Sequence, residues 1–107
     1  MKNDKVLSLL GLAKKAGKLK SGEFQVEEEI KRGRAKTVLV ANDASDNTKK
    51  KYSDMCAYRQ VPICFYSDKD NIGRCLGYDE RAAAVITDEG FASGIMKEID
   101  KLNNHGI

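Results

Sequence analysis

Apolar residues recur along the chain at two different spacings, and each spacing predicts a different secondary structure. Val6, Leu9, Leu10 and Ala13 repeat at intervals of three and four residues, which places them on one face of a helix. Residues 37–43, TVLVAND, form a β-branched and almost wholly apolar run, as is typical of a central strand buried on both faces. The chain is therefore predicted to contain both helices and buried strands.

The same two patterns divide the rest of the chain into alternating elements. Helices are predicted within residues 6–17, 22–33, 45–60, 67–77 and 89–102, the first of them capped by Asn3 or Asp4. Strands are predicted at residues 37–43, 62–66 and 82–88, with a short extended piece at 18–20. Strands that alternate with helices in this way predict an α/β fold, a three-layer α/β/α sandwich with a mostly parallel four-stranded sheet.

The segment SGEFQVEEEIKRGR is predicted to form a helix whose N-cap is Ser21 or Gly22. At about 100° per residue, Val26 and Ile30 fall on one face, and Phe24 lies about 160° away from Val26. The predicted helix thus has an apolar core face, and its first turn presents an aromatic ring to solvent.

Three consecutive glutamates, Glu27 to Glu29, lie in the middle of this helix. Glu27 precedes Lys31 by four residues and Glu28 precedes Arg32 by four, which is the favourable order for ion pairs along a helix, worth about 0.2–0.5 kcal/mol each. The glutamates are therefore predicted to form a solvated surface that is neutralised within the helix itself.

The N-terminal turn of this helix is the part predicted to bind a ligand. The backbone N–H groups of Gly22, Glu23 and Phe24 have no partner inside the helix. They are free to bind a phosphate or the edge of a base.

The distribution of charge favours a polyanionic partner. The 107 residues carry a formal net charge of +3, which permits such a partner without requiring one. Residues 1–51 contain 13 Lys and Arg against 7 Asp and Glu, a balance of +6, and residues 52–107 contain 6 against 9, a balance of −3. A chain of this length is expected to form a single domain, residues 1–107, with its core at about 5–102.

The cysteines and the apolar runs point to a cytoplasmic protein. Cys56, Cys64 and Cys75 are odd in number, form no CxxC pair and are accompanied by a single histidine, His105. We expect reduced thiols, with neither a disulfide framework nor a zinc site. No apolar run approaches the roughly 20 residues that span a bilayer, and the N-terminus lacks the apolar region of a signal peptide. We expect no contact with a membrane.

Motifs for catalysis are weak in this sequence. A phosphate-binding loop starting at Gly11 would need glycine at position 16, which is Ala16. His105 is a poor base for any of the three thiols. Asp68 and Asp70 are better explained as helix caps than as metal ligands. We therefore expect no enzymatic activity, no cofactor, no metal and no small-molecule substrate.

The order of the segments resembles a known family. The runs LKSGEFQVEEEIKRGRAKTVLVANDAS, VPICFY and IGRCLGYDERAAAVITDEG are similar to the kink-turn-binding ribosomal proteins, the L-seven-Ae and L-thirty-e superfamily. LLGLAKKAGKLKSGE and NDASDNTKKK are most similar to its small bacterial YlxQ-type members. The resemblance covers roughly residues 5–100. Its motif positions are Gly22, Ile30, Arg32, Gly33, Ala35 and Lys36, together with the run Ile72–Gly77.

This resemblance implies a non-enzymatic RNA-binding protein with an L-thirty-e-like fold. Family members bind a kink-turn, a sharply bent internal loop with tandem sheared G·A pairs. They hold it with the N-terminus of the helix after the first short strand and with the loop before the last strand. By position, these elements are Lys20–Glu28 and Tyr78–Arg81.

The first element departs from the family pattern. Well-studied members carry Gly-x-Asn-Glu-x-x-Lys, in which the Asn and Glu contact the G·A pairs and the Lys contacts the RNA. The matching residues here are Gly22, Phe24, Gln25 and Glu28. Gln25 can still hydrogen-bond base edges, and Phe24 can stack on an unstacked base, whereas Glu28 would repel a nearby phosphate.

The second element also departs, because family members place apolar residues there. This chain has Tyr78, Asp79, Glu80 and Arg81. Tyr78 can stack on a base, and Arg81 can pair with a phosphate or a guanine edge. The alternative is that Tyr78 only closes the end of a helix and that Asp79 or Glu80 neutralises Arg81 in solvent.

Two hypotheses follow for the function. The first is a monomeric protein that binds ribosomal RNA or another RNA with a kink-turn or a related internal loop. The second is a protein-interaction module that docks on ribosomal, translation or transcription factors through Phe24. The predicted RNA-binding residues are Lys18, Lys20, Ser21, Gly22, Glu23, Phe24, Gln25, Glu28, Lys36, Tyr78, Asp79, Glu80 and Arg81.

Overall fold

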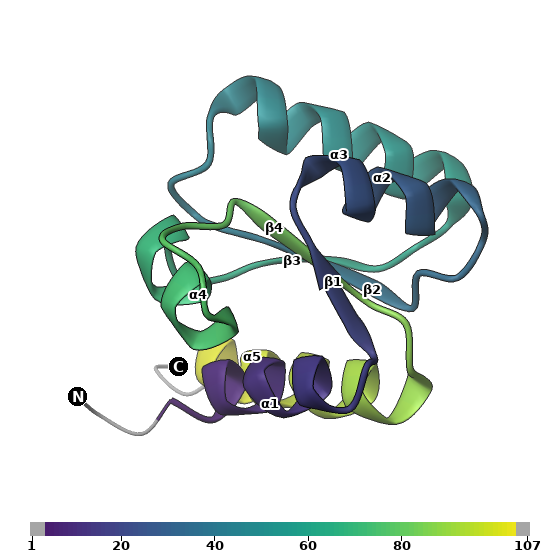
Figure 1. The fold of residues 1–107 in the computed structure, drawn as a ribbon. Helices are drawn as coiled ribbons and strands as arrows, with labels where there is room; N and C mark the ends of the chain where they lie inside the picture. The colour runs from purple at the N-terminus through teal and green to yellow at the C-terminus, as the bar shows by residue number, and fades with distance from the viewer. Residues whose placement is uncertain (1–3, 105–107) are drawn as a thin grey trace.

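Five helices and four strands make up residues 4–104, the part of the chain that the computed structural model describes (Figure 1). In chain order they are α1 (Lys5–Lys15), β1 (Leu19–Ser21), α2 (Glu23–Lys31), β2 (Thr37–Val40), α3 (Asp46–Arg59), β3 (Ile63–Phe65), α4 (Lys69–Leu76), β4 (Ala83–Ile86) and α5 (Glu89–Asn104). Every predicted helix and strand is present, with ends shifted by a few residues. Asn3 and His105 lie outside the described residues.

Local hydrogen bonds explain where the helices begin and end. The carboxylate of Asp4 accepts a hydrogen bond from the N–H of Leu7 at 3.0 Å and so caps α1. The carboxylate of Asp68 caps α4 in the same way, and Asp70 lies in the first turn of that helix without capping it. Gly77 ends α4 in the left-handed conformation, with φ of 87°. The capping role predicted for Asp68 is therefore confirmed.

The sheet is mixed, so the prediction of a mostly parallel sheet is wrong. Its strand order is β1-β4-β2-β3, and within it β2 and β3 are parallel, whereas β4 is antiparallel to both β1 and β2. The reason lies in the chain between β3 and β4. The N–H of Arg81 donates to the carbonyl of Lys69 at 3.1 Å, so the chain returns to the start of α4, next to the end of β3. Strand β4 therefore starts at the end of the sheet where β3 finishes, and it runs in the opposite direction.

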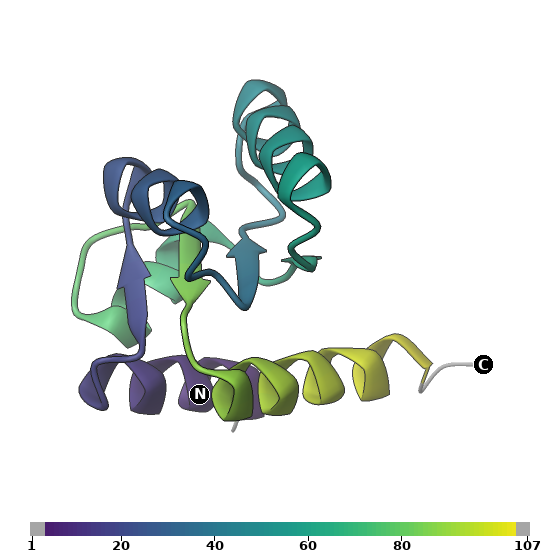
Figure 2. The same ribbon diagram turned by 90° about the vertical axis from the view of Figure 1, so that its right-hand side faces the viewer.

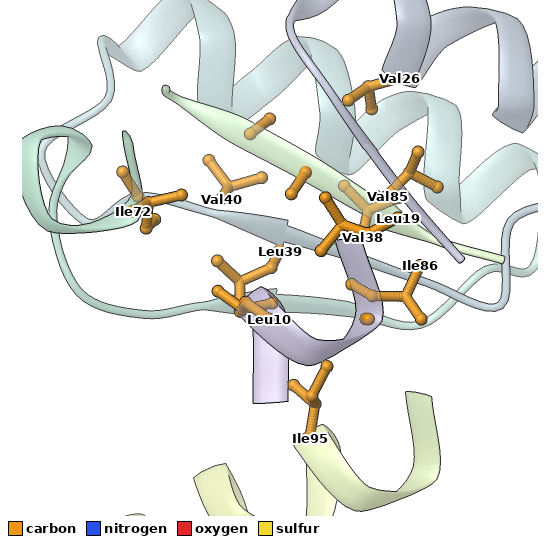
Figure 3. Packing of buried hydrophobic residues seen from close by; sticks show 14 of the residues in the cluster. Leu10, Leu19, Val26, Val38, Leu39, Val40, Ile72, Val85, Ile86 and Ile95 are labelled. Atoms are coloured by element: carbon orange, nitrogen blue, oxygen red, sulfur yellow. The ribbon is translucent and has the colours of Figure 1, made fainter. Parts of the chain in front are cut away.

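Helices cover both faces of this sheet, which confirms the three-layer arrangement. Helices α2 and α3 lie side by side on one face, and α1 and α5 lie on the other (Figures 1 and 2). Helix α4 packs against α1. Figure 3 shows Val26 of α2 on one side of the central strands, with Leu10 of α1 and Ile95 of α5 on the other. The apolar strands β2 and β4 are fully buried between these layers.

Buried and half-buried side chains include groups that titrate only in alkali. Burial raises the pKa of the Cys56 and Cys75 thiols from the ordinary 9.0 to about 11. Burial, together with a hydrogen bond from its hydroxyl to Asp4, raises the pKa of Tyr66 from 10.0 to about 12. The three cysteines are free. Within residues 4–104 no His, Cys, Asp and Glu side chains form a group of three or more able to hold a metal ion, and no helix is long and apolar enough to cross a membrane.

These raised pKa values predict a loss of stability in alkali. Between about pH 9 and pH 12 the folded state keeps protons that the unfolded state has already released, so the free energy of unfolding falls as pH rises. Below about pH 9 both states are protonated and this contribution is fully present. We expect the midpoint of thermal unfolding to be level from pH 7 to 8.5 and to fall steadily above pH 9. A midpoint that stays constant up to pH 11 would contradict this.

Candidate nucleic-acid interface

The junction between β1 and α2 depends on Gly22. Its φ of 92° and ψ of 147° lie in a region that is essentially restricted to glycine. Space does not demand the glycine, because a Cβ added there would meet nothing nearer than Nε of Arg81, at 4.0 Å. The N–H of Gly22 donates to the carbonyl of Ala83 at 3.4 Å, and its own carbonyl accepts from Val26 at 2.9 Å. The chain thus changes from strand to helix within one residue that is fixed to β4.

The N-terminus of α2 presents free backbone donors. Gly22 provides no side-chain cap, and the N–H groups of Glu23, Phe24 and Gln25 donate to no group within residues 4–104. The prediction of free N–H groups at Gly22, Glu23 and Phe24 is therefore wrong by one position, since the N–H of Gly22 bonds to the sheet. Three adjacent donors at a helix N-terminus can bind phosphate or a base oxygen.

The side chains of α2 are arranged as the helical spacing predicts. Val26 and Ile30 are buried, and Phe24 is 76% exposed. Gln25 is also exposed, next to Phe24. An aromatic ring and an amide therefore project from the same turn as the free N–H groups.

The prediction that the three glutamates form one solvated surface is wrong. Glu29 is buried, and its carboxylate accepts two hydrogen bonds from Arg34, at 2.8 Å from Nε and 3.0 Å from Nη2. These bonds lower the pKa of the Glu29 carboxyl. Glu28 pairs with Arg32 at 3.1 Å, as predicted.

Glu27 makes its ion pair with a neighbouring helix. Nζ of Lys51 in α3 lies 2.8 Å from Glu27 and 2.8 Å from Glu23. The two carboxylates raise the pKa of the Lys51 ammonium. Because Glu23 is the first residue of α2, this ion-pair cluster fixes the N-terminal turn of α2 against α3. The predicted pair between Glu27 and Lys31 is not formed.

The loop between α4 and β4, residues 77–82, lies directly on α4. The N–H of Tyr78 donates to the carbonyl of Gly73 at 2.8 Å. An ideal Cβ on Gly73 would lie only 2.4 Å from Cα of Glu80 and 2.7 Å from its nitrogen. Glycine at this position therefore allows two segments of backbone to touch. The glycine inside the run IGRCLG positions the loop.

Arg81 joins this loop to the start of α2. Its Nε donates to Oγ of Ser21 at 3.0 Å, and its Nη1 donates to the carbonyl of Glu80 at 3.1 Å. Its guanidinium carbon lies 3.6 Å from the centre of the Tyr78 ring, a cation–π contact. The alternative in which the Asp79 or Glu80 carboxylate neutralises Arg81 is not observed, because Arg81 instead contacts a ring, a hydroxyl and a backbone carbonyl.

The structure brings some of the predicted site residues together and leaves others apart. Ser21, the α2 N-terminus, Tyr78 and Arg81 share one end of the sheet. Lys18 and Lys36 belong to the other end, because Leu19 and Thr37 both pair with Ile86. The three residues of β1 separate Lys18 from Gly22, which is four steps along an extended chain, or about 13 Å.

The other predicted residues are spread over both ends of the sheet. Lys20 is exposed on β1 and contributes to the lowered pKa of Glu29. Lys36 lies 3.8 Å from the Glu89 carboxylate, and Glu80 lies 3.8 Å from Lys69. Asp79 is exposed in the loop.

Sequence reasoning missed Lys14 as a neighbour of the site. Its Nζ lies 4.8 Å from the centre of the Tyr78 ring. Nothing in the sequence indicates this contact, since it depends on how α1 packs against α4. Gly73 was detectable in part, because a glycine inside a predicted helix has an energetic cost that suggests a packing role.

Two bacterial proteins of similar sequence are named "RNA-binding protein YlxQ". The one from Bacillus subtilis (strain 168) is 44% identical over 92 residues, which are 86% of this chain and 92% of that protein. The one from Enterococcus faecium is 41% identical over 88 residues, which are 82% of this chain and 84% of that protein.

Two solved structures share the fold. A protein with unknown function from Bacillus halodurans C superposes with a TM-score of 0.87 at 37% identity, over 92% of this chain and 99% of that one. The Giardia lamblia 15.5kD RNA binding protein superposes with a TM-score of 0.75 at 22% identity, over 95% of this chain and 93% of that one. The second likeness is evidence of fold alone.

The family resemblance is confirmed. The model of the ribosomal protein L7Ae/L30e/S12e/Gadd45 family matches residues 4–97, and both YlxQ relatives exceed 40% identity over most of their length. The chain therefore belongs to the ribosomal protein L7Ae/L30e/S12e/Gadd45 family and is similar to its YlxQ members.

Proposed function

We propose that this protein binds structured RNA and that it recognises a kink-turn or a related internal loop. The names of the two YlxQ relatives support RNA binding. The contact between Arg81 and Ser21 at 3.0 Å carries the proposal, because it places the α4–β4 loop beside the N-terminus of α2. The family resemblance implies that these two elements hold the RNA, and here they form one surface.

Each part of this surface has a separate role in the proposed complex. The free N–H groups at the start of α2 and the amide of Gln25 hydrogen-bond base edges. The exposed ring of Phe24 stacks on an unpaired base. Arg81 supplies charge and planar donors for a phosphate or a guanine. Tyr78 already has Arg81 against its ring, so it supports the guanidinium as well as offering a stacking surface.

We propose that this geometry favours a bent RNA. A protein that binds the kinked form better than the extended form shifts the equilibrium by the difference between its two affinities. The N–H groups at the start of α2 are held to the sheet through Gly22, and the loop that carries Arg81 is held to α4 through Gly73. Both sets of donors are therefore fixed in position, and they favour the RNA conformation that reaches both of them. We propose that the protein stabilises the kinked state as a cytoplasmic monomer.

A binding role is proposed in preference to catalysis. Burial raises the pKa of Cys56 and Cys75 to about 11, so both thiols are protonated at neutral pH, and the thiolate is the reactive form. Burial likewise raises the pKa of Cys64. The thiols fit small core residues better than nucleophiles.

The test is a titration of the purified protein into a labelled kink-turn RNA and into a matched duplex without the G·A pairs, over a series of salt concentrations. We expect tighter binding to the kink-turn by at least about tenfold, which is roughly 1.4 kcal/mol, and a steep loss of affinity with salt. Equal affinity for the two RNAs would overturn the proposed recognition of a kink-turn.

A second candidate function is supported by the exposure of Phe24. A ring that is 76% exposed next to the acidic Glu23 could dock on a protein of the ribosome or the transcription machinery instead of RNA. Weak RNA binding with a shallow salt dependence would favour this second function. The variant Phe24→Ala distinguishes the two, since it lowers RNA affinity only if the ring stacks on a base, a contact worth about 1–3 kcal/mol.

A further inference from the structure

We propose that the C-terminal end of α1 is a third element of the RNA interface, where Lys14, Lys15 and Lys18 bind the phosphates of a strand that passes over Tyr78. The inference rests on the proposed function and adds a phosphate-binding surface to it. The family resemblance assigns contacts only to Lys20–Glu28 and Tyr78–Arg81, so neither Lys14 nor Lys15 belongs to the predicted site.

The surface is continuous from Lys14 to the start of α2. Nζ of Lys14 lies 4.8 Å from the centre of the Tyr78 ring, and an ideal Cβ on Gly77 would lie 4.0 Å from the same Nζ. The Tyr78 ring in turn contacts Arg81, and Arg81 reaches Ser21. A row of contacts therefore runs from Lys14 across the loop to the residue before Gly22, and Lys18 lies outside this row, at the opposite end of β1.

The arrangement of the elements agrees with this row. The loop follows α4, which packs against α1, and it leads into β4, the neighbour of the edge strand β1. A strand of RNA that contacts the N-terminus of α2 and then follows this loop would reach the end of α1.

The lysines at this end of the molecule carry positive charge that no carboxylate compensates. Lys14, Lys15 and Lys18 are exposed, and none of them forms an ion pair within residues 4–104. Among the described residues, other lysines do have carboxylate partners, which are Lys36, Lys50, Lys51, Lys69 and Lys101. In the neighbouring loop Asp79 and Glu80 add two exposed carboxylates, the second of them paired with Lys69, and Arg81 adds one cation. The surface remains net positive, as a phosphate backbone requires.

A simpler explanation accounts for part of this pattern. Lys14 and Lys15 lie in the last turn of α1, where cations interact favourably with the helix dipole. That explanation does not cover Lys18, which follows the helix and its left-handed Gly17. The helix-dipole explanation also predicts that these lysines affect protein stability alone. The salt dependence of RNA binding therefore separates that explanation from phosphate binding.

The experiment compares two triple variants that each remove three positive charges. One is K14Q/K15Q/K18Q at the end of α1, and the control is K50Q/K97Q/K101Q on α3 and α5. Both are titrated with the kink-turn RNA over a salt series. The slope of log K against log salt is negative, and each phosphate contact that is lost reduces its magnitude by roughly 0.7–0.9. We expect the α1 variant to lose about two units of slope and to bind about 10–100-fold more weakly at low salt, whereas the control changes the slope by less than half a unit.

The outcomes separate this inference from the proposed function. The wild-type protein alone decides whether the kink-turn is preferred, and the two triple variants decide whether α1 contributes. Equal loss of slope in the two variants would overturn the inference, because general charge would then explain the binding. The single variant Lys14→Gln changes one exposed side chain that contacts the Tyr78 ring, so it tests the same surface if the α1 triple variant fails to fold. We expect it to lower the slope by about 0.7–0.9, and an unchanged slope would also count against the inference.

Discussion

Replacing Gly73 by alanine is expected to lower the free energy of unfolding by about 2–3 kcal/mol and to weaken RNA binding as well. The added Cβ would lie 2.4 Å from Cα and 2.7 Å from the nitrogen of Glu80. Both are backbone atoms, so the loop of residues 77–82 must move as a whole, and overpacking of this kind typically costs about 1–3 kcal/mol. Movement of the loop separates Arg81 from Ser21. Chemical denaturation and the kink-turn titration measure the two effects.

The same substitution in another helix provides the control. Gly94 lies within α5, where an added Cβ would meet Leu9 at 3.8 Å, an ordinary contact. Since alanine is favoured over glycine inside a helix by about 0.5–1 kcal/mol, Gly94→Ala is expected to stabilise the protein and to leave RNA binding unchanged. If Gly73→Ala also stabilised the protein, the close approach of the loop to α4 would be wrong.

Replacing Arg81 is expected to have the largest effect on RNA affinity among single side-chain changes. Arg81→Ala removes the guanidinium that contacts Tyr78 and Ser21, and with it a charged, planar donor in the middle of the proposed surface. We expect a loss of about 1–3 kcal/mol in binding to the kink-turn RNA, which is the value of one good side-chain contact to a base. Fluorescence titration at fixed salt measures the change.

A lysine at the same position separates charge from geometry. Arg81→Lys keeps one positive charge but loses the planar fork, so it is expected to restore the salt dependence and only part of the affinity. Arg59→Ala is the matched control, because Arg59 lies on α3 and its Nη1 also donates to a backbone carbonyl, that of Lys31, at 2.8 Å. Equal losses of affinity for Arg81→Ala and Arg59→Ala would show that Arg81 has no special part in binding.

Several features of the site were predictable because they depend on residues close together in the chain. The spacing of Val26 and Ile30 gave the buried face of α2 correctly, and the position of Phe24 relative to them gave its exposure. Asp68 was recognisable as a cap because its partner, Asn71, lies three residues away. The pair between Glu28 and Arg32 follows from the same helical geometry.

Other features were not predictable, because the same local pattern fits more than one arrangement. Glu27 had an acceptable partner in Lys31, yet the packing of α2 against α3 gave it Lys51 instead. Glu29 differs from its two neighbours only in facing the protein, where Arg34 makes its burial possible. A helical pattern gives the direction of each side chain, but the neighbouring elements decide which of those directions lead to solvent.

The kinds of element, their order along the chain and the family were all predictable from the amino-acid sequence. They were predictable because helix and strand periodicity are properties of adjacent residues, and because the family motifs are continuous runs. The folded structure was needed to reveal the direction of β4 and the contact of Arg81 with Ser21, two residues that are 60 positions apart along the chain. It was likewise needed to reveal the contact of Lys14 with Tyr78. These depend on which faces pack together and on the path of the loop over Gly73, and such long-range choices are fixed by the shape of the whole core.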